Sequence, residues 1–478
     1  MTLKRYNASN IALSRKERFF VVPETSYGAI AEPANTDLVI PIDPSNWDQE
    51  PDLKKDKAAH ATRSKRKMLL GMLKHGTGSL KTHMYVSGTA GTAPPQDRLL
   101  NGGMGNKIAR AADTVQAAPA PTTTTFLPGT PANFSVGQPV LVDIGNPAHQ
   151  ELALITAIDA VTNVVTVAPA FSAAPVATAN IYAAVGYTLA DELPSYSVWQ
   201  DFYDEVFVYL GTVWDKISVV KKPGEDVELT MGSGFQRVIR CGTDTLYADV
   251  ASGAATVVTV QDGRKFDVGA RFNLSDGTST ETKLIVTGKA LNAGAGPTNP
   301  YLTDLTVTRG TGAQAWTAAN GIDVYPWIPA GVESGTVVMG HRGTMVLNGA
   351  AMNVLSGQVD MDNKVVFHED EAIAQDYVLS YATPGERDLK PKLEVFFRQS
   401  DLFLFGDALT ITSEAVMLPS YAMDANGNPK AGYVCALVLP QTTFKIPKIT
   451  DKSGERVLTI DADPYYNAGN DDLAIWFL

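Results

Sequence analysis

The sequence predicts a mainly-β protein assembled from several small sandwich or barrel units, and three observations support this prediction. The chain has 478 residues, of which 40 are glycine and 28 are proline, a balance that favours many short strands joined by turns. Apolar and polar residues alternate with period two along several stretches, as they do in half-buried strands. An internal repeat is the third observation. The length exceeds that of one compact core, so we expect roughly two to four domains.

The clearest alternation lies near the middle of the chain. Residues 205–209 and 212–219 alternate, and the pattern resumes at 227–231 after a turn that contains Pro223 and Gly224. Two alternating runs on either side of such a turn predict a β-hairpin with one buried face. Further strands are expected at 81–87, 392–398, 408–413 and 433–439, and short helices at 94–100 and 369–377.

A longer pattern occurs twice. Residues 134–137 read FSVG and residues 266–269 read FDVG, and each motif is followed by an apolar run. The two copies then match at Glu151 and Glu281, at 154–155 and 284–285, at 164–167 and 305–308, and at 179–182 and 320–325. Strands at 122–126 and 255–260 open the two units. The repeat predicts two copies of one small barrel or sandwich of five or six strands, with chance similarity between two β-rich stretches as the alternative.

The repeat divides the chain into a scaffold with two insertions. We expect the scaffold at 1–110 plus 186–245 for its first half and at 329–478 for its second half. Module 1 is then 111–185, and module 2 is 246–328. Two similar insertions favour the hypothesis that the scaffold itself is duplicated, and a charged loop precedes a strand in each half, at 63–67 and at 385–387.

Charge and cysteine content exclude several classes. The 39 Lys and Arg residues face 51 Asp and Glu residues, a net charge of −12, which disfavours a protein whose main task is gripping nucleic acid. Two cysteines, Cys241 and Cys435, are too few for a disulfide framework or a zinc cluster. No apolar run is long enough for a membrane-spanning helix. The N-terminus lacks the apolar segment of a secretory signal, so we expect synthesis in a cytoplasm.

No motif predicts a catalytic, cofactor-binding or metal site, and we expect no enzyme. The six histidines are scattered without ligand spacing: His60, His75, His83, His149, His341 and His368. The acidic run at 368–371 is either a cation site or, more simply, an exposed turn. Residues 424–428 begin like a calcium loop, but Pro429 and Cys435 stand where that loop needs glycine and glutamate, so we expect a hairpin tip. The glycines at 102–105 lack phosphate-loop spacing.

Four stretches resemble the tail tube (major tail) proteins of long-tailed bacteriophages. The N-terminal one reads FFVVPETSYG at 19–28 and continues with EPANT at 32–36. The others are 63–66 with 88–100, 193–198 with 209–211, and 347–350 with 357–363. The resemblance covers the scaffold and skips the two modules.

This resemblance implies a structural virion protein. Six β-sandwiches, each with one helix, would close a ring through a continuous inner sheet, and rings would stack into a tube around a tape-measure protein, between initiator and terminator proteins. Genomic DNA would pass through the lumen without specific binding, consistent with the acidic chain. A duplicated scaffold favours three chains per ring, a trimeric pseudo-hexamer, over six. The modules would decorate the outside of a virion tail made in the host cytoplasm.

The basic run at 54–67, which has no interleaved aromatic residue, leads to the hypothesis of a contact with the next ring. The alternative function is a virion-surface or extracellular β-sandwich adhesin that binds glycans. A carbohydrate-active enzyme is a third class and would need two carboxylates about 5 to 10 Å apart.

Overall fold

The computed structural model describes residues 17–55, 68–145, 149–202, 204–253, 256–309, 313–347, 349–352, 354–369, 378, 380–411, 413–423, 427–452, 454–466 and 469–478. The prediction of a mainly-β protein is confirmed, because 52% of the residues lie in strands. Two short helices occur in the described ranges, α1 (Asp97–Met104) and α2 (Phe403–Thr410). Among the same residues, no helix is long and apolar enough to span a membrane.

One long strand organises the first half of the scaffold. Strand β17 (Val206–Lys221) pairs through 206–212 with β16 (Tyr196–Asp201), and through 206–210 with β19 (Arg237–Cys241) on its other side. Its last part pairs with β18 (Glu228–Phe235), as the alternation predicts for the hairpin. Strand β17 therefore runs from an outer sheet into an inner one. The outer sheet also contains β1 (Arg18–Pro23) and β2 (Leu38–Val39), and the inner sheet contains β6 (Gly76–His83) and β3 (Asn46–Asp48).

The second half repeats this pairing pattern. Strand β34 (Pro429–Phe444) pairs through 429–442 with β33 (Glu414–Met423), through 435–438 with β37 (Ala474–Phe477), and through 442–444 with β36 (Glu455–Pro464). The remaining strands correspond one by one. Strands β27 (Met345–Leu347) and β28 (Ala350–Met352) take the places of β1 and β2, and β32 (Asp388–Phe396) and β29 (Val354–Asp362) take those of β6 and β3.

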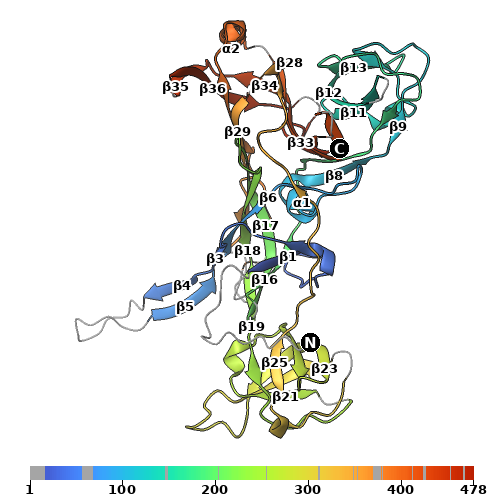
Figure 1. Cartoon of the computed structure of the whole chain (residues 1–478). Coiled ribbons are helices and arrows are strands. Elements are labelled where there is room, and N and C mark those ends of the chain that lie inside the picture. The colour runs from blue at the N-terminus through green and yellow to red at the C-terminus, as the bar shows by residue number, and fades with distance from the viewer. Residues whose placement is uncertain are drawn as a thin grey trace.

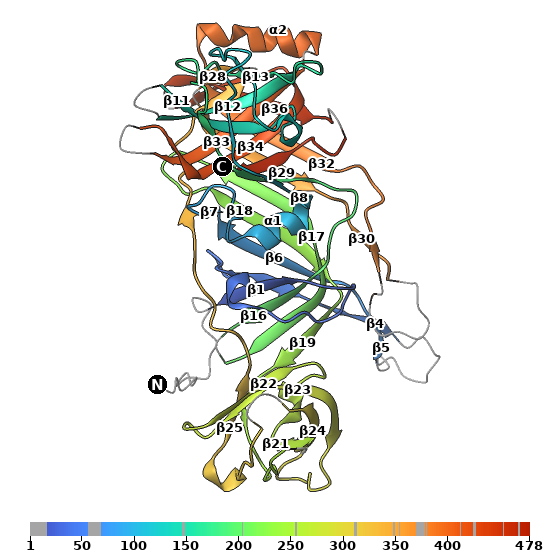
Figure 2. The ribbon, with the colours of Figure 1, turned by 90° about the vertical axis from the view of Figure 1, so that its right-hand side faces the viewer.

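The two halves share one inner sheet. Residues 216–221 of β17 pair antiparallel with residues 362–357 of β29. The inner sheet consequently runs without interruption through β3, β6, β18, β17, β29, β32 and β36 to β35 (Lys448–Lys452). A second link joins β15 (Ala184–Leu189) to β37, with β8 (Gly105–Arg110) beyond it. The result is an elongated molecule with α2 at one end and module 2 at the other (Figures 1 and 2).

The two modules have the same strand order. Module 1 is the six-stranded sheet β10-β13-β12-β11-β14-β9, and module 2 is the sheet β21-β24-β23-β22-β25-β20. The bounds in module 1 are β9 (Asp113–Thr114), β10 (Thr125–Phe126), β11 (Pro139–Ile144), β12 (His149–Ile158), β13 (Val165–Ala168) and β14 (Asn180–Ile181). Those in module 2 are β20 (Asp244–Thr245), β21 (Val257–Val260), β22 (Arg271–Ser275), β23 (Thr280–Leu291), β24 (Thr303–Thr308) and β25 (Asp323–Pro326).

Three short strand pairs form separate two-stranded sheets. They are β4 (Pro51–Lys55) with β5 (Met68–Leu73), β7 (Tyr85–Val86) with β26 (Thr336–Val337), and β30 (Val366–Phe367) with β31 (Tyr381–Ala382). The pair β4–β5 precedes β6, and the pair β30–β31 precedes β32, so the two halves correspond here as well.

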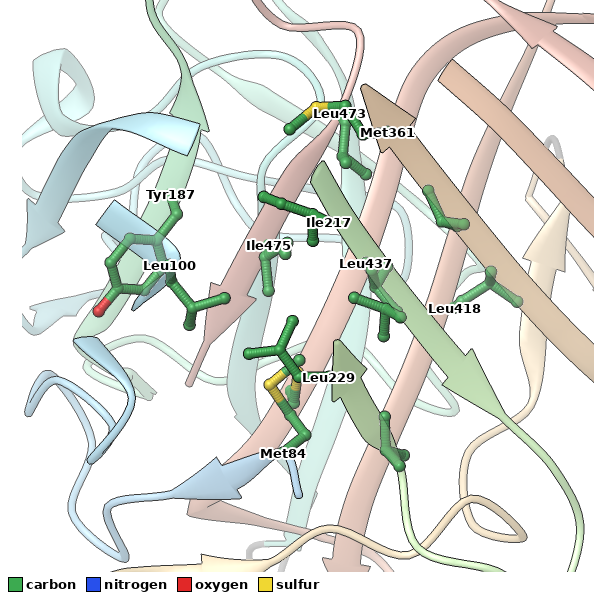
Figure 3. Close-up of a cluster of buried hydrophobic side chains, with 14 of the residues drawn as sticks. Met84, Leu100, Tyr187, Ile217, Leu229, Met361, Leu418, Leu437, Leu473 and Ile475 are labelled. Atoms are coloured by element: carbon green, nitrogen blue, oxygen red, sulfur yellow. The ribbon is translucent and has the colours of Figure 1, made fainter. Parts of the chain in front are cut away.

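Side chains from both halves form one core between the inner and outer sheets. Leu100 of α1 lies beside Tyr187 and Ile475, and Ile217 lies near Leu437 (Figure 3). These residues are almost fully buried. Each contributes on the order of 1.5–3 kcal/mol to folding when it leaves water. Because residues of both halves belong to this one core, neither half is an independent sandwich with a core of its own.

Two local predictions need correction. The prediction of a strand at 408–413 is wrong, because residues 403–410 form helix α2. The β-branched run at 410–412 favoured a strand, but Leu404 and Phe405 turn one face of a helix towards the core. The helix expected at 94–100 begins at Asp97 and continues to Met104. The helix expected at 369–377 lies almost entirely outside the described residues.

Candidate assembly surfaces

The outer sheets are not open surfaces, because the modules cover them. Trp199 and Val208 of the first half belong to one buried cluster with Phe272 of module 2. On the second half, Ala436 and Trp476 are buried with Leu141 of module 1. Each module thus packs on the outer sheet of one half, and equivalent faces of the duplicated scaffold are covered in the same way.

The inner sheet has one apolar and one polar face. Along β17, Ile217 and Val219 are buried, whereas Lys216 and Ser218 lie on the opposite face. Strands β6, β18, β29 and β32 alternate in the same way, as expected for a sheet with one solvated side. A shallow depression of the polar face is lined by residues of five strands: Ser79, Lys216, Ser218, Thr230, Gly232, Asp360, Asp362, Asp388 and Lys390, with parts of Ile217 and Met361.

Carboxylates pair with several cations of this polar face. Lys81 Nζ lies 3.0 Å from Glu228 Oε1, and Lys364 Nζ lies 3.1 Å from Asp362 Oδ2. Lys390 pairs with Asp388. Across the seam between the halves, Ser218 Oγ donates to Asp360 Oδ1 at 2.5 Å. Ion pairs of this kind reduce the number of cations that are free to bind phosphates.

Buried polar contacts tie the two halves together at the seam. Asn363 Nδ2 donates to the carbonyl oxygen of Gly103 at 2.9 Å, which joins the end of β29 to α1. Lys221 Nζ, at the end of β17, donates to the carbonyl oxygens of Arg342 at 3.1 Å and of Pro419. Burial lowers the pKa of Lys221 to about 8. These contacts fix the angle between the halves.

The inner sheet ends in two strands with a free edge. In the described part of the chain, β3 pairs with β6 alone and β35 pairs with β36 alone. All five residues of β35 are exposed, as are Asn46 and Asp48 of β3. An exposed strand edge is a template for pairing with another chain.

Both cysteines and two of the glycines singled out in the sequence, Gly102 and Gly103, are buried. No group of three or more metal-ligating side chains occurs among the described residues. Cys241 and Cys435 are buried, and burial raises the pKa of Cys435 to about 12, so its thiol is a poor nucleophile at neutral pH. Gly102 and Gly103 belong to α1 and pack against Trp214 and Ile217.

Three sequence motifs have structural roles or fall outside the described ranges. Glu369 belongs to the acidic run at 368–371, and its Oε1 atom lies 2.6 Å from Nδ1 of His75. Residues 424–428 connect β33 to β34 as the predicted hairpin tip, although 424–426 lie outside the described residues. The basic run at 54–67 also lies outside them, apart from the backbone of Lys54 and Lys55 in β4.

Sequence reasoning missed the buried seam residues and the exposed side of α2. A lone Asn or Lys in an alternating run gives no signal of burial. Helix α2 could have been found from the apolar spacing of Leu402, Phe405 and Leu409, which lie three and four residues apart.

No protein-family model matches the chain, and no curated protein matches its sequence.

Proposed function

We propose that this chain is a structural subunit that assembles into closed rings, and that the rings stack into a tube of the bacteriophage tail type. The observation that carries the proposal is the shared inner sheet, which already joins two similar halves edge to edge and, among the residues that the structure describes, ends in two unpaired edges. A repeat of the same junction between chains would continue the sheet, and closure into a ring would leave no free edge. Three chains would supply six scaffold halves.

The polar face of the inner sheet would line the lumen. Several of its lysines are paired with carboxylates, which reduces the number of cations free to bind phosphates, so duplex DNA could pass without tight binding. The modules on the opposite, outer sheets would decorate the outside of the tube. The same proposal includes a tape-measure protein in the lumen, initiator and terminator proteins at the ends of the tube, and a location in the virion tail. This structural role requires no catalysis and no cofactor.

Negative-stain electron microscopy across protein and salt concentrations tests this function. We expect hollow rings or tubes with a lumen of roughly 20 Å or more, enough for duplex DNA, and averaged images with threefold symmetry and six similar lobes. Seeding with preformed assemblies is included, because subunits of this kind can remain monomeric until nucleated. Single particles under every condition, with or without seeds, would contradict the proposal and favour a glycan-binding adhesin.

A further inference from the structure

Helix α1 shows what the junction between two scaffold halves looks like. Every residue of Asp97–Met104 is buried or half-buried. On its own half, the helix packs closely on Trp214 and Ile217 of β17. From the other half, Asn363 donates to its Gly103 carbonyl oxygen, and Ile475 of β37 packs beside Leu100 (Figure 3). Helix α1 therefore fills the space where the second half meets the first.

Helix α2 has the same place in the second half but lacks that cover. It follows β32 as α1 follows β6, and it lies at the free end of the molecule (Figure 2). Leu404 is fully buried, whereas Leu409 is 72% exposed and Phe403 is 41% exposed. Apart from Asp407 and Thr410, α2 has no polar side chain, and a helix that is apolar over most of its surface is normally buried over most of it. We call the exposed residues Leu402, Phe403, Leu409 and Ile411 the α2 face.

The backbone at Ile411 adds a second observation. This residue ends α2 with a φ of 53°, in the left-handed region, and its side chain is 75% exposed. A β-branched residue is strained in that conformation, for which Gly or Asn is the usual choice. An exposed, strained isoleucine is unfavourable for the isolated chain, and strain of this kind concentrates at functional surfaces.

We propose that a second copy of this chain covers the α2 face with its first half, as the second half covers α1 within one chain. Strand β35 of one copy would pair with β3 of the next, because β35 continues the inner sheet as the last part of β17 does and β3 holds the position of β29. Charge is compatible with this pairing: β35 carries Lys448 and Lys452 against one carboxylate, Asp451, and the exposed carboxylates Asp48 and Glu50 lie on or beside β3. The contact joins two different surfaces, so it is head-to-tail and able to form a ring.

This interface deepens the proposed ring assembly and rests on it. The test compares three full-length variants with wild type by analytical ultracentrifugation and electron microscopy, under conditions where wild type assembles. The first carries Leu409→Asp and Ile411→Asp, the second carries Asn46→Lys and Asp48→Lys on β3, and the control carries Val161→Asp in module 1, where the side chain is 90% exposed. We expect each of the first two to remain monomeric and the control to assemble as wild type does.

Mixing the first two variants distinguishes a head-to-tail contact from a symmetric one. Each variant retains one intact surface, so the mixture should form a heterodimer and nothing larger. An α2-face variant that still forms rings, or a mixture that stays monomeric, would overturn the interface. Failure of wild type to assemble would instead overturn the ring function itself.

A further variant separates assembly from folding. Asn accepts the left-handed conformation, so Ile411→Asn should raise the thermal midpoint of the monomer while weakening self-association by about tenfold or more. A gain in stability with no loss of assembly would show that Ile411 takes no part in the contact.

Discussion

Asn363 reaches across the middle of the molecule and donates a hydrogen bond from Nδ2 to the carbonyl oxygen of Gly103, 2.9 Å away. The two residues are 260 positions apart in the chain. Their contact anchors the end of β29 to α1 at the point where the two scaffold halves share a core.

Removal of the Asn363 amide should destabilise the whole scaffold. The side chain is 2% exposed, so Asn363→Ala leaves the buried carbonyl of Gly103 without this donor and should cost about 1–3 kcal/mol of unfolding free energy. Urea unfolding measures the loss. The exposed Asn320 is the control, and Asn320→Ala should change the free energy by less than about 0.5 kcal/mol. Equal effects of the two substitutions would contradict a special role for the seam.

The attachment of α2 should weaken as pH rises. Burial, with a contribution from the nearby Asp407 carboxylate, raises the pKa of Glu414 from 4.5 to about 7. The folded chain therefore binds the proton more tightly than the unfolded chain, and its contribution to stability is lost between about pH 4.5 and 7. We expect a higher thermal midpoint at pH 5.5 than at pH 8, and a smaller difference in Glu414→Gln. An unchanged pH dependence in that variant would assign the effect to other groups.

The repeat provides its own control for a buried ion pair. In module 2, Glu281 is fully buried and receives hydrogen bonds from Arg309 Nε at 2.6 Å and Trp316 Nε1 at 2.9 Å. Its counterpart in module 1, Glu151, is partly exposed and is bound by Ser172 and His149. Glu281→Ala should cost about 3–5 kcal/mol, because it strands a buried cation. Glu151→Ala should cost clearly less. Calorimetry measures the loss of unfolding free energy in each variant. Equal losses would contradict the prediction that module 2 depends more strongly on this glutamate than module 1 does.

The carboxylates of the inner sheet should keep the lumen from binding DNA. Asp360→Lys with Asp388→Lys reverses charge on the polar face, and we expect the rings to gain salt-sensitive DNA binding. Electrophoretic mobility shifts at several salt concentrations measure this. The control is Glu205→Lys with Glu225→Lys, at exposed positions in loops away from the depression. Binding that is equal in both variants would reflect net charge alone.

The repeat in the sequence anticipated more of the fold than the local patterns did. The FSVG and FDVG motifs lie at equivalent points just before β11 and β22, and Glu151 and Glu281 lie in the equivalent strands β12 and β23. Local patterns were less dependable where contacts between segments distant in the sequence decide the secondary structure. The run at 408–413 contains strand-forming residues, yet residues 403–410 form helix α2, whose Leu404 packs into the core.

The sequence by itself determined the β class, the hairpin of β17 and β18, and the existence of two similar modules, since alternation and repetition depend only on the order of residues along the chain. Tertiary structure decided which edges pair, which faces the modules cover and which ends stay open. Pairing of β17 with β29 joins strands that 132 residues separate, between Lys221 and Val354, and no local pattern encodes such a choice. It depends on the shared core, the buried Asn363 and Lys221, and the match of two folded halves.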